Sequence, residues 1–142
     1  MKVLIGIDPG KYTGLAVIIN GKLDLWTIDF WTTIEQLHQH HNIYGDDLRV
    51  YIEDPNPNKP VFFRKGTKSK VMHNIAQKVG SNKREASLLI EYCRLNGIKV
   101  FPQVPKKGSM TKLKADYFKR LTGCKGRSSE HARDAAMLIF GR

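Results

Sequence analysis

The sequence is short of acidic residues, cysteine and long apolar runs, and each shortage excludes a class of protein. Asp and Glu total 13 against 24 Lys and Arg in 142 residues, so the formal net charge is +11. The two cysteines, Cys93 and Cys124, have no metal-type spacing, and we expect reduced thiols rather than a disulfide scaffold. The apolar run that ends at Asp8 is too short for a signal peptide or a membrane span. We therefore expect a soluble, cytoplasmic protein that has no membrane partner.

The few acidic residues are unevenly distributed along the chain. Residues 1–54 hold four basic and eight acidic side chains, whereas residues 55–142 hold twenty basic and five acidic ones. Basic side chains bind phosphates and clustered carboxylates bind cations, so this division suits a metal-dependent phosphodiester enzyme. Charge alone leaves a second interpretation open, in which the basic surface only keeps the protein in solution.

The apolar pattern predicts one α/β domain that spans residues 1–142. Strands are predicted at residues 2–8, 15–19, 22–30, 48–53 and 98–101, and Asn20-Gly21 indicates a tight hairpin. Helices are predicted at residues 32–41, 82–95, 111–121 and 128–140, with Asn82 and Glu85 as a capping box. Residues 54–80 are interpreted as a long functional loop, in which residues 71–79 could form a frayed helix. This order of elements predicts a mixed five-stranded sheet flanked by helices.

Three carboxylates stand where such a sheet could bring them together. Asp8 ends the first strand, Glu53 ends the fourth, and Asp134 lies on the last helix, three residues after His131. If strands one and four are parallel neighbours, Asp8 and Glu53 emerge at the same edge. Crowded carboxylates repel one another unless divalent cations lie between them, and two Mg²⁺ ions would support phosphodiester hydrolysis. Each residue also has a structural interpretation: a turn cap, an edge-strand charge and a structural His–Asp pair.

Three motifs resemble those of RuvC-type Holliday junction resolvases, which belong to the ribonuclease-H-like superfamily, in their short phage-like version. They are Gly6-Ile7-Asp8-Pro9-Gly10 with Thr13-Gly14-Leu15-Ala16, Tyr51-Ile52-Glu53, and Glu130-His131-Ala132-Arg133-Asp134-Ala135-Ala136. The resemblance implies the ribonuclease-H-like fold and a site of Asp8, Glu53, His131 and Asp134 for two Mg²⁺ ions, which Mn²⁺ would replace. It also implies a homodimer that cleaves branched DNA, four-way junctions above all, in a bacterial cell or phage-infected host. His131 stands where many relatives have Asp.

The basic second part of the chain supplies candidate DNA contacts. The segment Phe101–Lys106 is similar to a strand-to-lysine segment of the resolvases, which implies that Lys106 lies near the scissile phosphate. An aromatic residue after the second acidic strand enters the junction in these relatives, which favours Phe62 or Phe63, although either ring could instead belong to the core. The predicted contacts are Phe62, Phe63, Arg64, Lys65, Lys68, Lys70, Lys83, Arg84, Lys107, Lys112 and Lys114.

Several alternatives stay open at this point. The apolar helix face of Ala86, Leu89, Ile90 and Cys93 fits either a dimer interface or the core. A ribonuclease-H-like nuclease that acts on RNA or RNA–DNA hybrids is one rival function. A non-catalytic nucleic-acid-binding protein of the same fold is another. The histidines at positions 38, 40 and 41 do not share one helical face, so we interpret them as surface residues.

Overall fold

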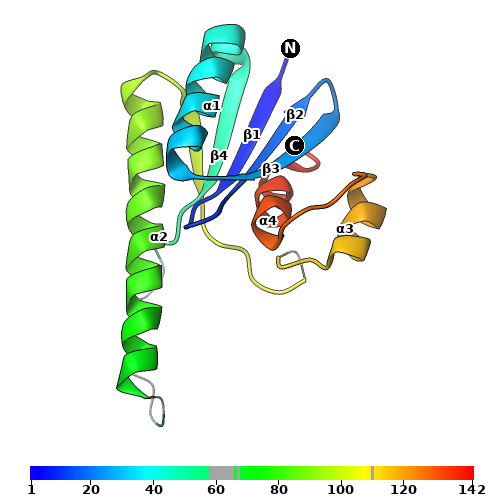
Figure 1. Cartoon of the computed structure of the whole chain (residues 1–142). Helices are drawn as coiled ribbons and strands as arrows, with labels where there is room; N and C mark the ends of the chain where they lie inside the picture. Colours follow the sequence, from blue (N-terminus) through cyan, green and yellow to red (C-terminus); the bar gives the residue numbers. More distant parts are fainter. Residues whose placement is uncertain (58–65, 67, 110) are drawn as a thin grey trace.

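The structure, a computed structural model, describes residues 1–57, 66, 68–109 and 111–142 of the chain. The strands are β1 (Val3–Asp8), β2 (Thr13–Ile19), β3 (Lys22–Ile28), β4 (Leu48–Glu53) and β5 (Lys99–Gln103). The helices are α1 (Phe30–Tyr44), α2 (Ser69–Leu95), α3 (Ala115–Thr122) and α4 (Glu130–Ile139), and a 3-10 turn, η1, covers Gly45–Asp47. The strands form one sheet in the order β3-β2-β1-β4-β5 (Figure 1). The prediction of an α/β fold with a mixed five-stranded sheet is confirmed.

The pairing of β1 decides where the candidate site lies. β1 is antiparallel to β2 and parallel to β4, with Ile7 opposite Ile52. Strands one and four are therefore parallel neighbours, as the acidic motifs required. Asn20 and Gly21 both have positive φ, 51° and 77°, which is the backbone of a tight hairpin turn between β2 and β3. The hairpin prediction is correct, and β2 begins two residues earlier than expected.

Alternation along the strands divides the core into two clusters. One cluster consists of β-branched and leucine side chains under α1 and α2, with Ile5, Ile7, Ile52 and Leu89 fully buried. The other lies under α3 and α4 and includes Leu4, Ala16, Tyr51 and Phe118. Figure 1 shows α1 and α2 on one side of the sheet and α4 with α3 on the other. Odd-numbered residues of β1 thus face α1 and α2, and even-numbered ones face α4.

Helix α2 overturns the loop predicted at residues 54–80. It begins at Ser69 and continues without a break to Leu95, so Asn82 and Glu85 lie inside the helix and do not cap it. No proline interrupts residues 69–95, and the cost of Gly80 in a helix interior is only about 1 kcal/mol. Figure 1 shows α2 extending well past the edge of the sheet. The face of Ala86, Leu89, Ile90 and Cys93 is buried in the core, which rules out its use as a dimer interface.

The remaining helices begin where local chemistry permits. The Asp29 carboxylate accepts the Thr32 N–H and caps α1, which therefore starts two residues before its predicted position. Helix α3 begins at Ala115 rather than Thr111, because Lys112 has φ 52°, outside the helical region. The Ser129 side chain caps α4, close to its predicted start.

Cys93 and Cys124 are both free thiols. Among the described residues, no helix has the length and apolarity that crossing a membrane requires.

Candidate active site

Strand alternation brings Asp8 and Glu53 to the same edge and the same face of the sheet. Asp8 follows Ile7 at the end of β1, and Glu53 follows Ile52 at the end of β4, the two residues that pair across the strands. Both carboxylates share the parity of residues that face α4, Gly6 in β1 and Tyr51 in β4. The two side chains are therefore neighbours under α4 at the carboxyl ends of parallel strands, where α/β proteins gather their ligand sites.

Two glycines let α4 lie directly on the sheet above these carboxylates. A Cβ atom at Gly6 would stand 2.1 Å from the Ala135 carbonyl oxygen, and one at Gly14 would stand 1.9 Å from that of His131. Any larger residue would push the helix backbone away. Ala132 and Ala135 line the same face of α4, so the contact is close on both sides. This close packing fixes the height of α4 above the strand ends.

Helix α4 places His131 against Asp8. The His131 Nδ1 donates a hydrogen bond to Asp8 Oδ2 over 3.0 Å. The imidazole side chain is 48% exposed, whereas the Asp8 side chain is 11% exposed. His131 thus lies between the buried carboxylate and solvent. This contact joins the first and third motifs of the sequence, which are separated by more than a hundred residues.

The buried carboxylates of this cluster are poor anions in the absence of a cation. Burial raises the pKa of Asp8 from 3.8 to about 6, against the lowering effect of His131, and Asp134 and Glu130 raise it further. Burial also raises the pKa of Glu53 from 4.5 to about 7, with added repulsion from Asp8 and Asp134. Asp8, Glu53 and Asp134 are thus near enough for repulsion among them to add to the effect of burial.

Asp134 is held by the segment that precedes α3. Its Oδ1 accepts the Lys112 backbone N–H at 2.8 Å and the Thr111 hydroxyl at 3.4 Å. One helical position earlier, Arg133 donates from Nε to the Leu113 carbonyl at 2.7 Å, so this segment is docked on α4 at two points. Within the described part of the chain, no three His, Cys, Asp or Glu side chains are grouped closely enough to hold a metal ion.

The predicted DNA contacts that the structure describes fall in two segments of the chain. Lys106 donates from Nζ to the Met137 carbonyl of α4 at 3.0 Å, one turn beyond Asp134, and does not contact a carboxylate. The predicted contacts at Phe62, Phe63, Arg64 and Lys65 lie outside the described residues. One segment is α2, which contains Lys70, Lys83 and Arg84 and has Lys68 as its N-cap residue. The other is the segment between β5 and α3, which contains Lys107, Lys112 and Lys114.

Sequence reasoning missed the residues that brace the turn after Asp8. Asn82 Oδ1 lies beside Gly10, and Glu85 lies near enough that the Gly10 N–H lowers the pKa of its carboxyl, against the larger raising effect of burial. Both side chains come from the middle of α2, where the sequence suggested a helix cap. The polar pair Asn82 and Glu85 did stand out in the sequence, but it was interpreted as a helix cap and not as a contact with the turn after Asp8. Thr111 and Lys112 were missed as partners of Asp134 because no local pattern marks them.

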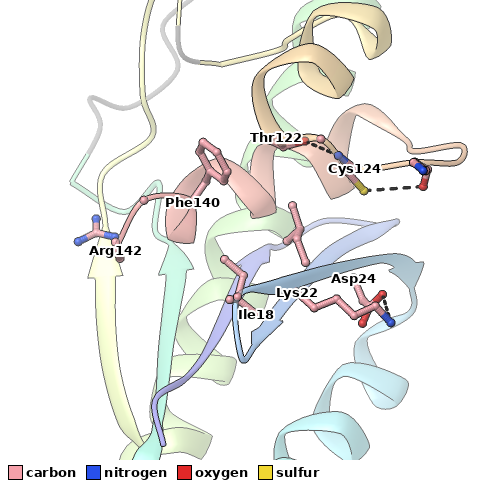
Figure 2. A pocket seen from close by; sticks show the side chains of 12 residues that line it. Ile18, Lys22, Asp24, Thr122, Cys124, Phe140 and Arg142 are labelled. Carbon is pink, nitrogen blue, oxygen red and sulfur yellow. Dashed lines mark hydrogen bonds and ion pairs between the residues drawn. The ribbon is translucent and has the colours of Figure 1, made fainter.

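One cavity and the histidines of α1 lie away from this edge. The cavity, of about 550 Å³, lies between the β2–β3 hairpin and the ends of α3 and α4, at the opposite end of β1 from Asp8. Figure 2 shows the side chains that line it. Its polar groups partner one another: Lys22 pairs with Asp24 at 3.4 Å, and Cys124 N–H donates to Thr122. On α1, His38 is exposed, while His40 and His41 are half-buried. His40 is engaged with the Gln36 carbonyl at 2.7 Å.

The comparisons with known proteins assign no family to this chain. No protein-family model matches the sequence, and a search of curated proteins finds no significant match.

Proposed function

We propose that this protein is a metal-dependent endodeoxyribonuclease that cleaves branched DNA, with four-way junctions as its preferred substrate. The proposal combines the resemblance of three motifs to RuvC-type resolvases with the arrangement of the residues that those motifs contain. The ribonuclease-H-like assignment belongs to the same proposal, and the mixed sheet with β1 antiparallel to β2 and parallel to β4 is consistent with it.

The observation that carries the proposal is the convergence of Asp8, Glu53, His131 and Asp134 at one edge of the sheet. These residues come from three elements, β1, β4 and α4, and their charges influence one another. A turn cap or an edge-strand charge would not require burial of Asp8 to 8% exposure beside two other acids. Such a cluster lowers stability by repulsion, and natural proteins retain it where function needs it.

The donor set fits a hard divalent cation such as Mg²⁺ or Mn²⁺. Carboxylate oxygens are the ligands that these ions prefer. Burial, with added repulsion from neighbouring acids, raises the pKa of Asp8 and Glu53, and a bound cation would oppose both effects. Asp8, Glu53, His131 and Asp134 would hold the metal by closing around it, because in the metal-free arrangement no three acid, histidine or cysteine side chains of the described residues are grouped closely enough to do so. When bound, a pair of such ions activates a water molecule and stabilises the leaving oxygen in phosphodiester hydrolysis.

The surrounding residues perform the rest of the work. The hydrogen bond from His131 orients the Asp8 carboxylate, and the Lys112 N–H with the Thr111 hydroxyl orients Asp134. The lysines of α2 and of the segment between β5 and α3 neutralise phosphates on either side of the acidic edge. Phosphate contacts position the nucleic acid, while the carboxylates act only at the scissile bond.

The decisive experiment replaces each carboxylate by its amide. Asp8→Asn, Glu53→Gln and Asp134→Asn should each reduce junction cleavage in Mg²⁺ by at least about 10³-fold and leave junction binding in EDTA within about twofold, because the basic residues are unchanged. Asp24→Asn, an acid at the opposite end of the sheet, is the matched control and should cleave normally. Near wild-type cleavage by any of the three variants would remove that residue from the site.

Substrate and assembly are tested in the same assay. Four-way junction, RNA–DNA hybrid and linear duplex are offered with and without Mg²⁺, and preferential cleavage of the hybrid would support the rival nuclease.

We also propose a homodimer, because a four-way junction presents two symmetric strands and a twofold dimer supplies two sites. Sedimentation with and without junction DNA measures this, and a monomer in both cases would contradict it.

A further inference from the structure

We infer that a cavity beside the candidate active site binds an unpaired nucleotide of the nucleic-acid substrate, with its base on Trp31 and its phosphates at Lys11 and Lys78. The inference rests on the proposed function and names a part of the substrate that none of the motifs assigns. The cavity has a volume of about 520 Å³, which accommodates a nucleotide.

The cavity adjoins the acidic edge. Lys11 belongs to the turn that follows Asp8, Phe30 and Trp31 open α1 directly after β3, and Lys78 and Asn82 come from the middle of α2. The end of β3 pairs with the start of β2, Ile28 opposite Thr13, so the start of α1 lies at the same edge of the sheet as Asp8. A strand that passes over the carboxylates is therefore within reach of this cavity.

Trp31 presents an unused aromatic surface at the rim. Its side chain is 73% exposed, although tryptophan is normally among the more buried residues. The Phe30 ring contacts it edge-on, with centroids 5.1 Å apart at 84°, and this contact supports the indole from one side. An exposed aromatic ring beside cations is the usual platform for an unpaired base, and each stacked base contributes about 1–3 kcal/mol. Tyr12, also exposed, lies next to Lys11 in the turn.

Two acids and two lysines line the cavity. The Asp29 carboxylate accepts the Thr32 N–H, whereas Glu85 Oε2 is buried with no hydrogen-bond partner among the described residues, and burial raises the pKa of Glu85. Among the described residues, neither Lys11 nor Lys78 forms an ion pair with an acid. The two lysines are therefore the cationic groups that a ligand meets, and burial disfavours the charged form of Glu85, the acid whose Oε2 lacks a partner among the described residues. This matches the phosphates of a nucleotide and not an acidic edge or a second cation.

A second copy of the chain is the competing occupant. On the other side of Trp31, an apolar groove of about 410 Å³ runs between α1 and α2, lined by Ile34, Leu88 and Leu95 among others. A protein partner would bury Trp31 together with this groove. The nucleotide is favoured because the cavity on the Lys11 side is lined by lysines, Gln77 and Asn82, whereas a protein interface centre is depleted of lysine.

The test uses Trp31 as its own reporter. The chain has two tryptophans, so a Trp26→Phe variant leaves Trp31 as the sole source of indole fluorescence. This variant is titrated with a short oligodeoxyadenylate in EDTA, where no cleavage occurs. We expect saturable quenching, because a stacked adenine quenches indole emission, and about a tenfold loss of affinity in Trp31→Ala. Trp26→Ala, an exposed tryptophan on β3 outside the cavity, is the matched control and should bind normally.

The lysines are tested by salt dependence. Lys11→Gln and Lys78→Gln should each reduce the slope of log affinity against log salt by about 0.7 on single-stranded DNA, whereas Lys22→Gln at the opposite end should leave it unchanged. Absence of quenching together with normal binding by Trp31→Ala would overturn the inference. So would a loss of dimerisation in Trp31→Ala with unchanged oligonucleotide affinity, which would assign Trp31 to a second copy. Quenching without cleavage by the wild type would refute the proposed nuclease and retain the nucleotide site.

Discussion

The two faces of the sheet are packed by different kinds of side chain. Under α1 and α2, large aliphatic residues such as Ile5, Ile7 and Leu89 fill the space between sheet and helix. Under α4, glycine in the strands meets alanine in the helix, and the two backbones approach until no Cβ fits at Gly6 or Gly14. The first face gains stability from the apolar surface area that it buries. The second face buries less apolar area, but its contact fixes the distance between α4 and the sheet.

The difference teaches where accuracy is needed in this molecule. The acidic cluster lies on the α4 face, and two of its four residues, His131 and Asp134, depend on the height and rotation of that helix over the strands. A bulky side chain can repack by changing rotamer, but a backbone-to-backbone contact has no such freedom. We therefore expect substitutions on the α4 face to impair the site out of proportion to their cost in stability.

The largest expected effect comes from adding one carbon at Gly14. In Gly14→Ala the new Cβ meets the His131 carbonyl, so α4 has to move, at a cost of about 1–3 kcal/mol in the free energy of unfolding. A shift of about 1 Å at His131 should reduce cleavage by roughly 10²-fold. Leu89→Ala on the other face should cost about 2–5 kcal/mol yet cleave at the wild-type rate wherever it is folded.

Both variants are compared by denaturant titration and by cleavage at a temperature where each is folded. Equal loss of cleavage in Gly14→Ala and Leu89→Ala, at equal folded fraction, would abolish the distinction between the faces. Wild-type cleavage by Gly14→Ala would show that the site tolerates movement of α4.

An effect of intermediate size is expected from pH in the absence of a divalent cation. The folded protein holds the Asp8 proton up to about pH 6, whereas the unfolded chain releases it near 3.8. Between these values the folded state binds more protons, so the free energy of unfolding falls as pH rises. The same sign holds for Glu53 between 4.5 and about 7. At pH 7.5, above the folded-state pKa of Asp8, Asp8→Asn should therefore stabilise the metal-free protein by about 1–3 kcal/mol.

This gain is measured by urea unfolding of Asp8→Asn and wild type in EDTA at pH 4 and at pH 7.5. Addition of Mg²⁺ should stabilise the wild type at pH 7.5 and leave Asp8→Asn nearly unchanged, because the variant lacks the charge that the cation neutralises. A stability of the wild type that rises from pH 4 to pH 7.5 in EDTA would contradict the predicted sign.

The smallest expected effect concerns Lys112. Its backbone has a positive φ, and its N–H donates a hydrogen bond to Asp134. Lys112→Gly keeps the N–H donor and removes the strain at φ 52°, while Lys112→Ala keeps the strain. The glycine variant should be more stable than the alanine variant by about 1 kcal/mol. Both should lose one phosphate contact on duplex DNA, which lowers the salt slope by about 0.9. Thermal unfolding and binding at several salt concentrations provide the readouts, and equal stability of the two variants would reject the strain.

The ends of β1 and β4, with their acids, were predictable because strand signals are local, whereas β3 ends at Ile28 rather than Phe30 and β5 at Gln103 rather than Phe101. A buried run that ends in Asp8, a second that ends in Glu53 and the hairpin at Asn20-Gly21 can each be recognised within a few residues. The Ser129 cap similarly identifies the start of α4. By contrast, the polar pair of Asn82 and Glu85 suggested a helix start, although tertiary contacts with the Gly10 turn use the same side chains inside a continuous helix.

The amino-acid sequence by itself determined the order of elements, the two-residue alternation that puts Asp8 and Glu53 on one face, and the uneven distribution of charge. Only the tertiary structure decided how near α4 lies to the sheet, which backbone and side-chain groups hold Asp134, and which lysines and aromatic rings share a cavity. The reason is range. Periodicity and capping act between residues a few positions apart, whereas the contacts of Gly14 with His131 and of Asp134 with Lys112 join segments whose distance only the folded chain sets.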